Sequence, residues 1–357
     1  MKKILALLLV FVLSFSVLAG CAPTETPVEE PTETPVEESV AEPAEEPMTE
    51  MGVITKLGLG HVISIESSSD KTDDKTAKAQ ADVTIMAVGF DMDGKVVSAE
   101  LDVAQTAVEF DENMAIITDT AEEFKTKKEL GTDYGMVKAS AIGKEWFEQA
   151  QALEEWMVGK TADEILGMKI EEGKTAEEDL VSSVTVHVGD YLAAFEQAWN
   201  EAIMVENAET VGLGVKTSVA SSTPAEADKG ALAQVDTMMA ATAFDSDNKV
   251  AGTVIDTAQV KINYDLEGKV ETDKMAEFKT KNELGTDYGM VKASAIGKEW
   301  FEQARALGDW MVGKTIDEIT SLELEDGKAT DEDLVSSVTI GIADYLYVVG
   351  ESAQTAK

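Results

Sequence analysis

The sequence predicts an α+β fold in two tandem homologous domains, each a small antiparallel sheet followed by helices, behind a disordered stalk. Three observations support this prediction: an internal duplication, a change from strand-like to helix-like patterns within each copy, and an N-terminal tract rich in Pro, Thr and Glu. Roughly three hundred residues follow that tract, which is enough for two ordinary domains.

The duplication is close to exact over one long block. Residues 123–150 read EFKTKKELGTDYGMVKASAIGKEWFEQA, and residues 277–304 repeat them with Lys128 replaced by Asn282. The same offset aligns Trp156 with Trp310. We therefore expect domains at 53–205 and 206–357, each with one site.

The front of each copy is typical of a hairpin. Residues 81–90 and 95–103 are rich in Val, Ile, Met and Thr, and they flank the turn sequence Asp-Met-Asp-Gly at 91–94. A calcium loop would need a longer segment with a distal glutamate, so we interpret this sequence as a turn. Asn248 in the second copy agrees, because Asn tolerates a left-handed backbone.

The rear of each copy is typical of helices. In the first copy, apolar residues recur at helical spacing at Trp146, Ala150, Leu153 and Met157. Gly159 follows as a stop signal. A second helix is predicted to begin near Glu177, with one apolar face that runs to Trp199.

The N-terminus predicts export. Lys2 and Lys3 precede an apolar run too short to span a bilayer, so residues 1–20 are interpreted as a signal peptide. The sequence Leu-Ala-Gly-Cys that ends at Cys21 resembles a lipobox, which implies lipidation of the thiol and anchoring to the extracellular face of the cell membrane through that lipid only. Cys21 is the only cysteine, so disulfides and thiolate metal sites are excluded.

The tract at 21–52 and the overall charge have simple physical interpretations. The tract has too few large apolar residues to offset backbone entropy, so we expect an extended, solvated stalk. The formal net charge of −40 argues against a nucleic-acid partner. Acidity alone indicates a solvated surface, and we assign it no catalytic role.

One heptapeptide, Asp-Leu-Val-Ser-Ser-Val-Thr, occurs at 179–185 and again at 333–339. Acidic and hydroxyl residues are ordinary at a helix start, where they accept hydrogen bonds from free amides. The segment also resembles the flavinylation motif of FMN-binding domains, although Val184 and Val338 stand where that motif usually has alanine.

The resemblance implies a covalent cofactor in each copy. A flavin transferase would join the phosphate of FMN to Thr185 and Thr339 as a phosphoester. The transferase would recognise Asp179 and Asp333, while small residues would leave room for the backbone to approach the cofactor at Ser182, Ser183, Ser336 and Ser337. We expect each threonine to stand where a helix begins, so that free amides and the helix dipole favour the phosphate.

Taken with the block YGMVKASAIGKEWFEQ, the lipobox and the acidic stalk, the chain is similar to PplA-type flavinylated lipoproteins of Gram-positive extracellular electron transfer. This resemblance implies a circuit in which a membrane NADH dehydrogenase reduces quinone. Electrons would then reach the two flavins and pass to ferric iron or another extracellular acceptor. We expect an electron carrier rather than an enzyme with a dedicated substrate, with no catalytic residue and no metal ligand.

Aromatic and basic residues of the duplicated block are further candidates. Tyr134 and Tyr288 could stack on the flavin ring, and Lys138 and Lys292 could face the flavin or its phosphate, although a solvated lysine is at least as common. We expect core packing for the tryptophans of the same block. His61 aligns with Val215 and His187 with Gly341, so no histidine site can occur in both copies, and His187 is expected at the surface.

Two other functions remain open at this point. A non-redox surface lipoprotein that binds a solute or acts as an adhesin would need a pocket or an exposed aromatic patch. A surface reductase with one dedicated substrate would show steady-state turnover with purified donors.

Overall fold

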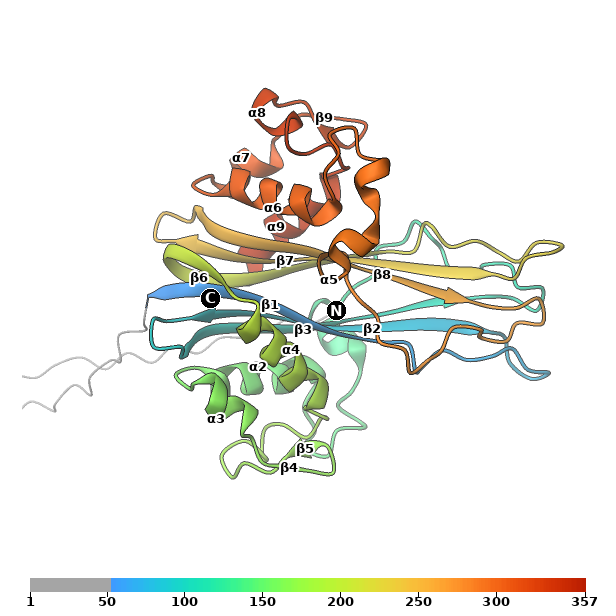
Figure 1. Ribbon diagram of the computed structural model, residues 1–357. Helices are drawn as coiled ribbons and strands as arrows, with labels where there is room; N and C mark the ends of the chain where they lie inside the picture. The colour runs from blue at the N-terminus through green and yellow to red at the C-terminus, as the bar shows by residue number, and fades with distance from the viewer. Residues whose placement is uncertain (1–52) are drawn as a thin grey trace, which may run out of the picture. The chain divides into compact units, whose positions relative to one another are not determined.

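Three strands from each copy of the repeat join in one six-stranded antiparallel sheet in the computed structural model, which describes residues 53–357 (Figure 1). We call residues 53–202 the first half and residues 203–357 the second half. The strand order is β3-β2-β1-β6-β7-β8. The strands are β1 (Ile54–Ser64), β2 (Lys78–Phe90), β3 (Val96–Glu109), β6 (Ile203–Ser218), β7 (Leu232–Asp245) and β8 (Val250–Asn263). The predicted signal peptide, the lipidation site Cys21 and the stalk lie outside the described residues.

The predicted hairpin of the first half is confirmed. The carboxylate of Asp91 accepts hydrogen bonds from the backbone N–H groups of Asp93 (2.9 Å) and Lys95 (2.8 Å), and Gly94 has φ of 78°. In the second half Asn248 takes the left-handed conformation with φ of 57°. The same turn chemistry therefore closes both long hairpins.

The middle strand of each half is buried on both faces. Along β2 the residues alternate between two hydrophobic clusters: Val83 and Ile85 belong to one, while Met86 and Val88 belong to the other. This alternation follows from the two-residue period of a strand. The strands of each half are therefore covered on both faces of the sheet.

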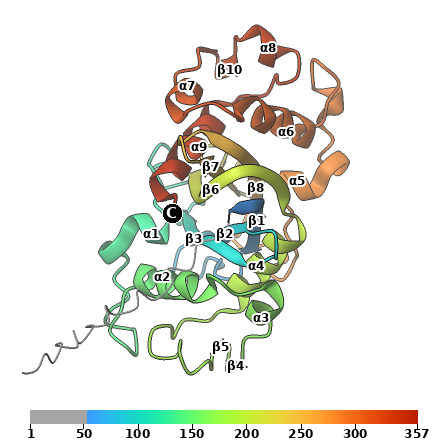
Figure 2. The same cartoon turned by 90° about the vertical axis from the view of Figure 1, so that its left-hand side faces the viewer.

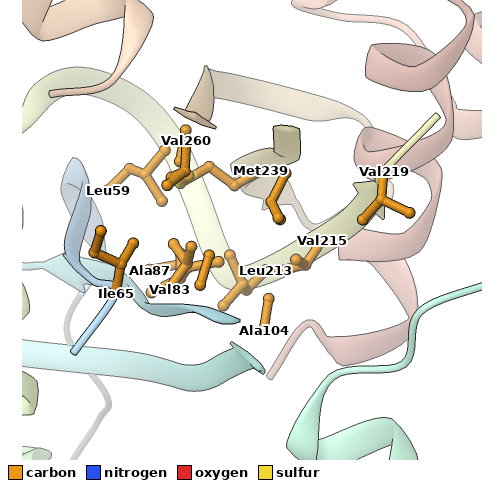
Figure 3. Close-up of a cluster of buried hydrophobic side chains, with 14 of the residues drawn as sticks. Leu59, Ile65, Val83, Ala87, Ala104, Leu213, Val215, Val219, Met239 and Val260 are labelled. Atoms are coloured by element: carbon orange, nitrogen blue, oxygen red, sulfur yellow. The ribbon is translucent and has the colours of Figure 1, made fainter. Parts of the chain in front are cut away.

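On the inner side, the two halves pack against each other. Figure 3 shows Val83 and Ala87 of the first half in one cluster with Leu213, Met239 and Val260 of the second half. Strands β1 and β6 also pair directly, with Leu57 opposite Ile203. The described residues fall in a single compact unit. The duplication thus takes the form of two matching halves that share one sheet and one core, and the boundary predicted between residues 205 and 206 falls inside β6.

On the outer sides, each half carries its own layer of helices (Figures 1 and 2). The first half has α1 (Lys127–Leu130), η1 (Gly131–Tyr134), α2 (Trp146–Met157), α3 (Ala162–Leu166) and α4 (Gly189–Asn200), with a short hairpin of β4 (Ile170–Glu171) and β5 (Lys174–Thr175). The second half has α5 (Lys281–Leu284), η2 (Gly285–Tyr288), η3 (Met290–Lys292), α6 (Trp300–Met311), α7 (Ile316–Thr320), α8 (Glu332–Val335) and α9 (Ala343–Thr355), with β9 (Leu324–Glu325) and β10 (Lys328–Ala329). The mixed helix and strand content and the antiparallel sheet confirm the coarse fold prediction. No helix within residues 53–357 combines the length and the apolar character that crossing a bilayer requires.

Glycines let the last helix of each half lie directly on the sheet. A Cβ atom at Gly60 in β1 would lie 1.8 Å from the backbone oxygen of Ala194 in α4, and one at Gly214 in β6 would lie 1.7 Å from that of Val348 in α9. Only a residue without a side chain permits this approach. The two halves therefore use the same helix-to-strand contact.

The predicted start of that last helix is wrong. Helix α4 begins at Gly189, not near Glu177, and the chain between them forms turns, a bend and an isolated bridge between Lys174 and His187. The N–H of Thr185 donates to the side chain of Gln149 (2.8 Å), and the N–H of Val188 donates to the carbonyl of Gly173 (3.0 Å). These tertiary hydrogen bonds and the stiff β-branched residues near Thr185 favour extended backbone over helix. In the second half, the four-residue helix α8 ends before Thr339, and α9 begins after it.

It follows that neither threonine stands at the opening of a helix. The expectation that a helix dipole and free helical amides favour a phosphate at these positions is therefore not met.

Candidate functional site

Thr185 and Thr339 are held in the same way. The N–H of Thr185 donates to Oε1 of Gln149 (2.8 Å), and its hydroxyl lies 3.2 Å from the same oxygen. In the second half, the N–H and the hydroxyl of Thr339 lie 2.8 Å and 3.2 Å from Oε1 of Gln303. Both glutamines are fully buried, whereas both threonines are half-buried. Each threonine is therefore held by a buried side chain while the residue itself is partly exposed.

The duplicated block fixes the glutamine in turn. Nε2 of Gln149 lies 3.2 Å from the Ser140 hydroxyl and 3.3 Å from the Lys144 carbonyl, which accept its hydrogen bonds. In the second half, Nε2 of Gln303 makes the equivalent pair of contacts, each at 3.2 Å. Because both ends of the amide are bonded, its orientation is defined. The threonine is thus positioned by a buried side chain whose partners all come from the repeated sequence.

In each half, a lysine of the short helix α1 or α5 lies over the rings of a tyrosine and a tryptophan. Nζ of Lys127 is 5.1 Å from the ring centroid of Tyr134 and 5.5 Å from that of Trp146. In the second half, Nζ of Lys281 is 5.3 Å from the ring centroids of both Tyr288 and Trp300. These distances fit a cation held by aromatic faces. Together with the threonine and glutamine, these residues form what we call the threonine site of each half.

One helix brings the parts of each threonine site together. Trp146 and Gln149 are three residues apart on α2, so their side chains are neighbours on one face. Trp146 is buried and its Nε1 donates to the Tyr191 hydroxyl at 2.9 Å, which confirms the predicted core role of this tryptophan. Trp300 is equally buried in the second half.

The basic residues of the site differ from those predicted. Lys138 and Lys292 are exposed, and the lysines that approach the aromatic rings are Lys127 and Lys281. Tyr134 and Tyr288 are half-buried beside those lysines. The sequence offers only a weak signal for this pairing, since Lys127 lies seven residues before Tyr134.

The other polar residues of the predicted motif lie on turns in the first half, and on helix α8 and the turn after it in the second half. Asp179 is exposed, and its carboxylate accepts a hydrogen bond from Nε1 of Trp156 (3.1 Å). Asp333 is exposed, and its N–H donates to the carboxylate of Asp331 (2.9 Å). Ser182 and Ser336 are exposed, while the next serines, Ser183 and Ser337, are half-buried.

The valines that depart from the family motif point inward. Val184 and Val338 are each 2% exposed and belong to the cluster that packs each helical layer on its sheet. Their bulk fills the protein interior. The surface around each hydroxyl is therefore formed by other residues.

A buried carboxyl group lies beneath the short helix before each tyrosine. Burial raises the pKa of Asp102 to about 6, although its carboxylate accepts hydrogen bonds from the N–H groups of Val103 (2.7 Å) and Lys128 (3.1 Å). Burial raises the pKa of Asp256 to about 6 as well. Burial also lowers the pKa of Lys281, against the opposing effect of Asp236 and Asp256. In the second half, the buried carboxylate and the lysine of the threonine site therefore influence each other.

The two histidines have different environments. His187 is exposed, as predicted. His61 is buried, and its Nε2 lies 3.0 Å from Oε2 of Glu283, so it links strand β1 of the first half to helix α5 of the second. Burial alone would raise the pKa of Glu283, but its hydrogen bonds with His61 and Thr280 lower it to about 2.

Within residues 53–357, no group of three or more His, Cys, Asp or Glu side chains is placed to hold a metal ion. No protein-family model matches the chain, and comparisons with curated proteins and with solved structures found no match. The interpretation of the threonine sites therefore depends on the chain's own sequence and geometry.

Proposed function

We propose that this protein is an extracellular electron carrier with two covalent FMN groups, joined through phosphoester bonds to Thr185 and Thr339. The observation that carries the proposal is the repeated presentation of the two hydroxyls. Each belongs to a half-buried threonine that ends the same heptapeptide, and each is oriented by a buried glutamine at the same two distances.

The surroundings of each hydroxyl suit modification by a second protein. Asp179 and Ser182 are exposed on the turns that lead to Thr185, while their counterparts Asp333 and Ser336 are exposed on the four-residue helix α8 and at its end. A flavin transferase can therefore reach these residues at the surface in both halves. The hydrogen bond to the glutamine fixes the threonine side chain while its outer face stays open to the incoming group.

The residues of each threonine site also fit a flavin. Lys127 and Lys281 supply a positive charge in an acidic chain, which complements a phosphate or an anionic ring. Tyr134 and Tyr288 offer aromatic surface next to that charge. When bound, the flavin would accept and release electrons singly or in pairs.

A covalent bond suits the charge of this chain. With a formal net charge of −40, the protein repels an anionic ligand, so occupancy by dilute free FMN would be low. In the proposed circuit, a membrane NADH dehydrogenase and quinone supply the electrons, and ferric iron or another extracellular acceptor receives them. The lipid on Cys21 would hold the protein at the membrane.

Intact mass and in-gel flavin fluorescence, on protein co-produced with a flavin transferase, test the proposal. We expect two FMN adducts on the wild type, one on Thr185→Ala, one on Thr339→Ala, and none on the double variant. Thr132→Ala removes an exposed threonine from outside the motif and should keep both adducts. A wild type that stays unmodified beside an active transferase would contradict the proposal.

A further inference from the structure

We propose that a cavity in the second half binds a small organic monoanion with an apolar or aromatic body, and that Arg305 recognises its charge. The cavity encloses about 600 Å³ between the start of β6, strand β8 and helices α5 and α6. This volume lies in the range of small-molecule sites in proteins. No residue of the threonine site lines this cavity, so the inference does not depend on the proposed function.

The first half shows why the cavity is large, because the equivalent space there measures only about 220 Å³. Lys128 contacts Glu100 and lies 2.6 Å from Glu154, while Lys357, from the C-terminus of the second half, lies 2.6 Å from Glu100 and 2.7 Å from Glu154. We call these four residues the charge cluster. The offset that aligns Trp156 with Trp310 places at the corresponding positions Val254, Asn282, Gly308 and Ile203. Shorter and uncharged side chains thus replace the whole cluster, and the space remains open.

The walls of this cavity expose apolar side chains. Met204 is 71% exposed and Ile203 is 40% exposed at the start of β6, and both line the cavity with Val254 and Phe301. Large apolar side chains that stay in contact with water gain free energy when a ligand covers them. The body of the ligand is therefore apolar.

Arg305 identifies the charge of the ligand. It is the only arginine in the 357 residues, it is exposed on α6, and no carboxylate in residues 53–357 lies within 4.0 Å of its guanidinium as an ion pair. A guanidinium offers a rigid set of donors that matches a carboxylate or sulfonate. The residue at the same position of the first half is Gln151, which lines the smaller space there.

Other polar groups of the lining restrict the ligand further. The carboxylate of Glu283 is already engaged by His61 (3.0 Å) and Gln197 (3.2 Å). Nδ2 of Asn282 donates to the carbonyl of Ile255 (2.9 Å), which leaves its side-chain oxygen to accept a hydrogen bond from a ligand. Glu201 and Asp309 are exposed at the same cavity and would repel a second negative charge, so a monoanion fits better than a dianion.

Titration of the full chain, produced without a flavin transferase, with 8-anilinonaphthalene-1-sulfonate tests the site. This probe is an aromatic monoanion whose fluorescence rises on binding to apolar surface. We expect one binding site per chain and about tenfold weaker binding by Arg305→Gln. The matched variant Gln151→Arg should leave the affinity unchanged, because the space beside it measures only about 220 Å³ and the charged side chains of Glu154 and Lys357 line it.

A second probe separates charge recognition from simple apolar adsorption. The neutral analogue N-phenyl-1-naphthylamine should bind wild type and Arg305→Gln equally. Arg305 is exposed, so its substitution should leave the melting temperature unchanged and a folding defect should not interfere. Equal binding of the sulfonate by wild type and Arg305→Gln would overturn the proposal, as would several equivalent sites on one chain.

Discussion

The two halves have the same threonine site, but the residue next to its lysine is charged in the first half and uncharged in the second. The duplicated block differs only at Lys128 and Asn282. That difference becomes intelligible in three dimensions, because the other members of the charge cluster, Glu100, Glu154 and Lys357, have changed as well. Burial would lower the pKa of Lys128, but Glu154 and Glu100 raise it. A buried set of charges is therefore either complete or absent, since an incomplete set leaves an uncompensated charge in the interior.

The largest expected effect comes from breaking the cluster in one half only. Lys128→Ala leaves two buried carboxylates with one cation, so we expect it to lower the free energy of unfolding by about 3 to 5 kcal/mol. Asn282→Ala removes one hydrogen bond at the equivalent position and should cost about 1 kcal/mol. Urea unfolding curves of both variants would measure the difference. Equal losses of unfolding free energy would mean that Lys128 contributes no more to stability than Asn282 does.

The second prediction concerns a feature that the halves share. Asp102 and Asp256 have pKa values of about 6 when folded against a usual value of 3.8, so the folded state binds their protons more tightly than the unfolded state. Their contribution to stability is fully present below about pH 4 and is lost as the pH rises through about 6. The loss is on the order of 3 kcal/mol for each carboxyl group.

Unfolding free energies measured across this pH range check the second prediction. Asp102→Asn and Asp256→Asn should each remove a similar part of the decrease. A wild type whose stability instead rises between pH 4 and 6, with the same profile in both variants, would contradict it.

A third prediction converts one half into the other. Replacing the charge cluster with its second-half counterparts, through Glu100→Val, Lys128→Asn, Glu154→Gly and Lys357→Ile, removes all four charges together. The cost should be about 2 kcal/mol, mainly from the space left behind, and smaller than that of Lys128→Ala alone. Chemical denaturation of the two proteins side by side is the measurement. A fourfold variant less stable than the single variant would refute the all-or-none interpretation.

The smallest effect should be equal in the two halves. Thr161 caps α3 and Thr315 caps α7, each by accepting a hydrogen bond from the N–H three residues later. Substitution of either by alanine should cost about 1 kcal/mol. Melting temperatures of the two variants would check this, and a clear inequality would show that the helical layers differ in more than the charge cluster.

Much of the local structure could be predicted from the sequence. The turn at Asp91, the helix from Trp146 to Met157 and the duplication all follow from short-range chemistry. The start of α4 could not be predicted, because Val181, Val184 and Val188 repeat at helical spacing although the backbone there is fixed by a contact with a distant residue. The side chain of Gln149, 36 positions earlier in the chain, accepts a hydrogen bond from the N–H of Thr185.

The sequence contained an indication that the two halves pack against each other. In β2 the run from Ile85 to Val88 is apolar on both faces, which is typical of a strand covered on both sides. For the candidate site, the motif identified the two threonines as candidates and the aromatic pattern identified the tyrosines. It missed Lys127 and Gln149, because their roles arise only when α2 brings distant segments together.

The interior shared by the halves has a consequence for the protein's assembly. A single copy of the repeat, made alone, would leave Leu59, Val83 and Ala87 facing water, and it would gain most by pairing with a second copy across that same surface. The tandem chain is in effect a twofold dimer made into one polypeptide. Because the copies are joined in one chain, the same position can carry different residues in each, as Lys128 and Asn282 do.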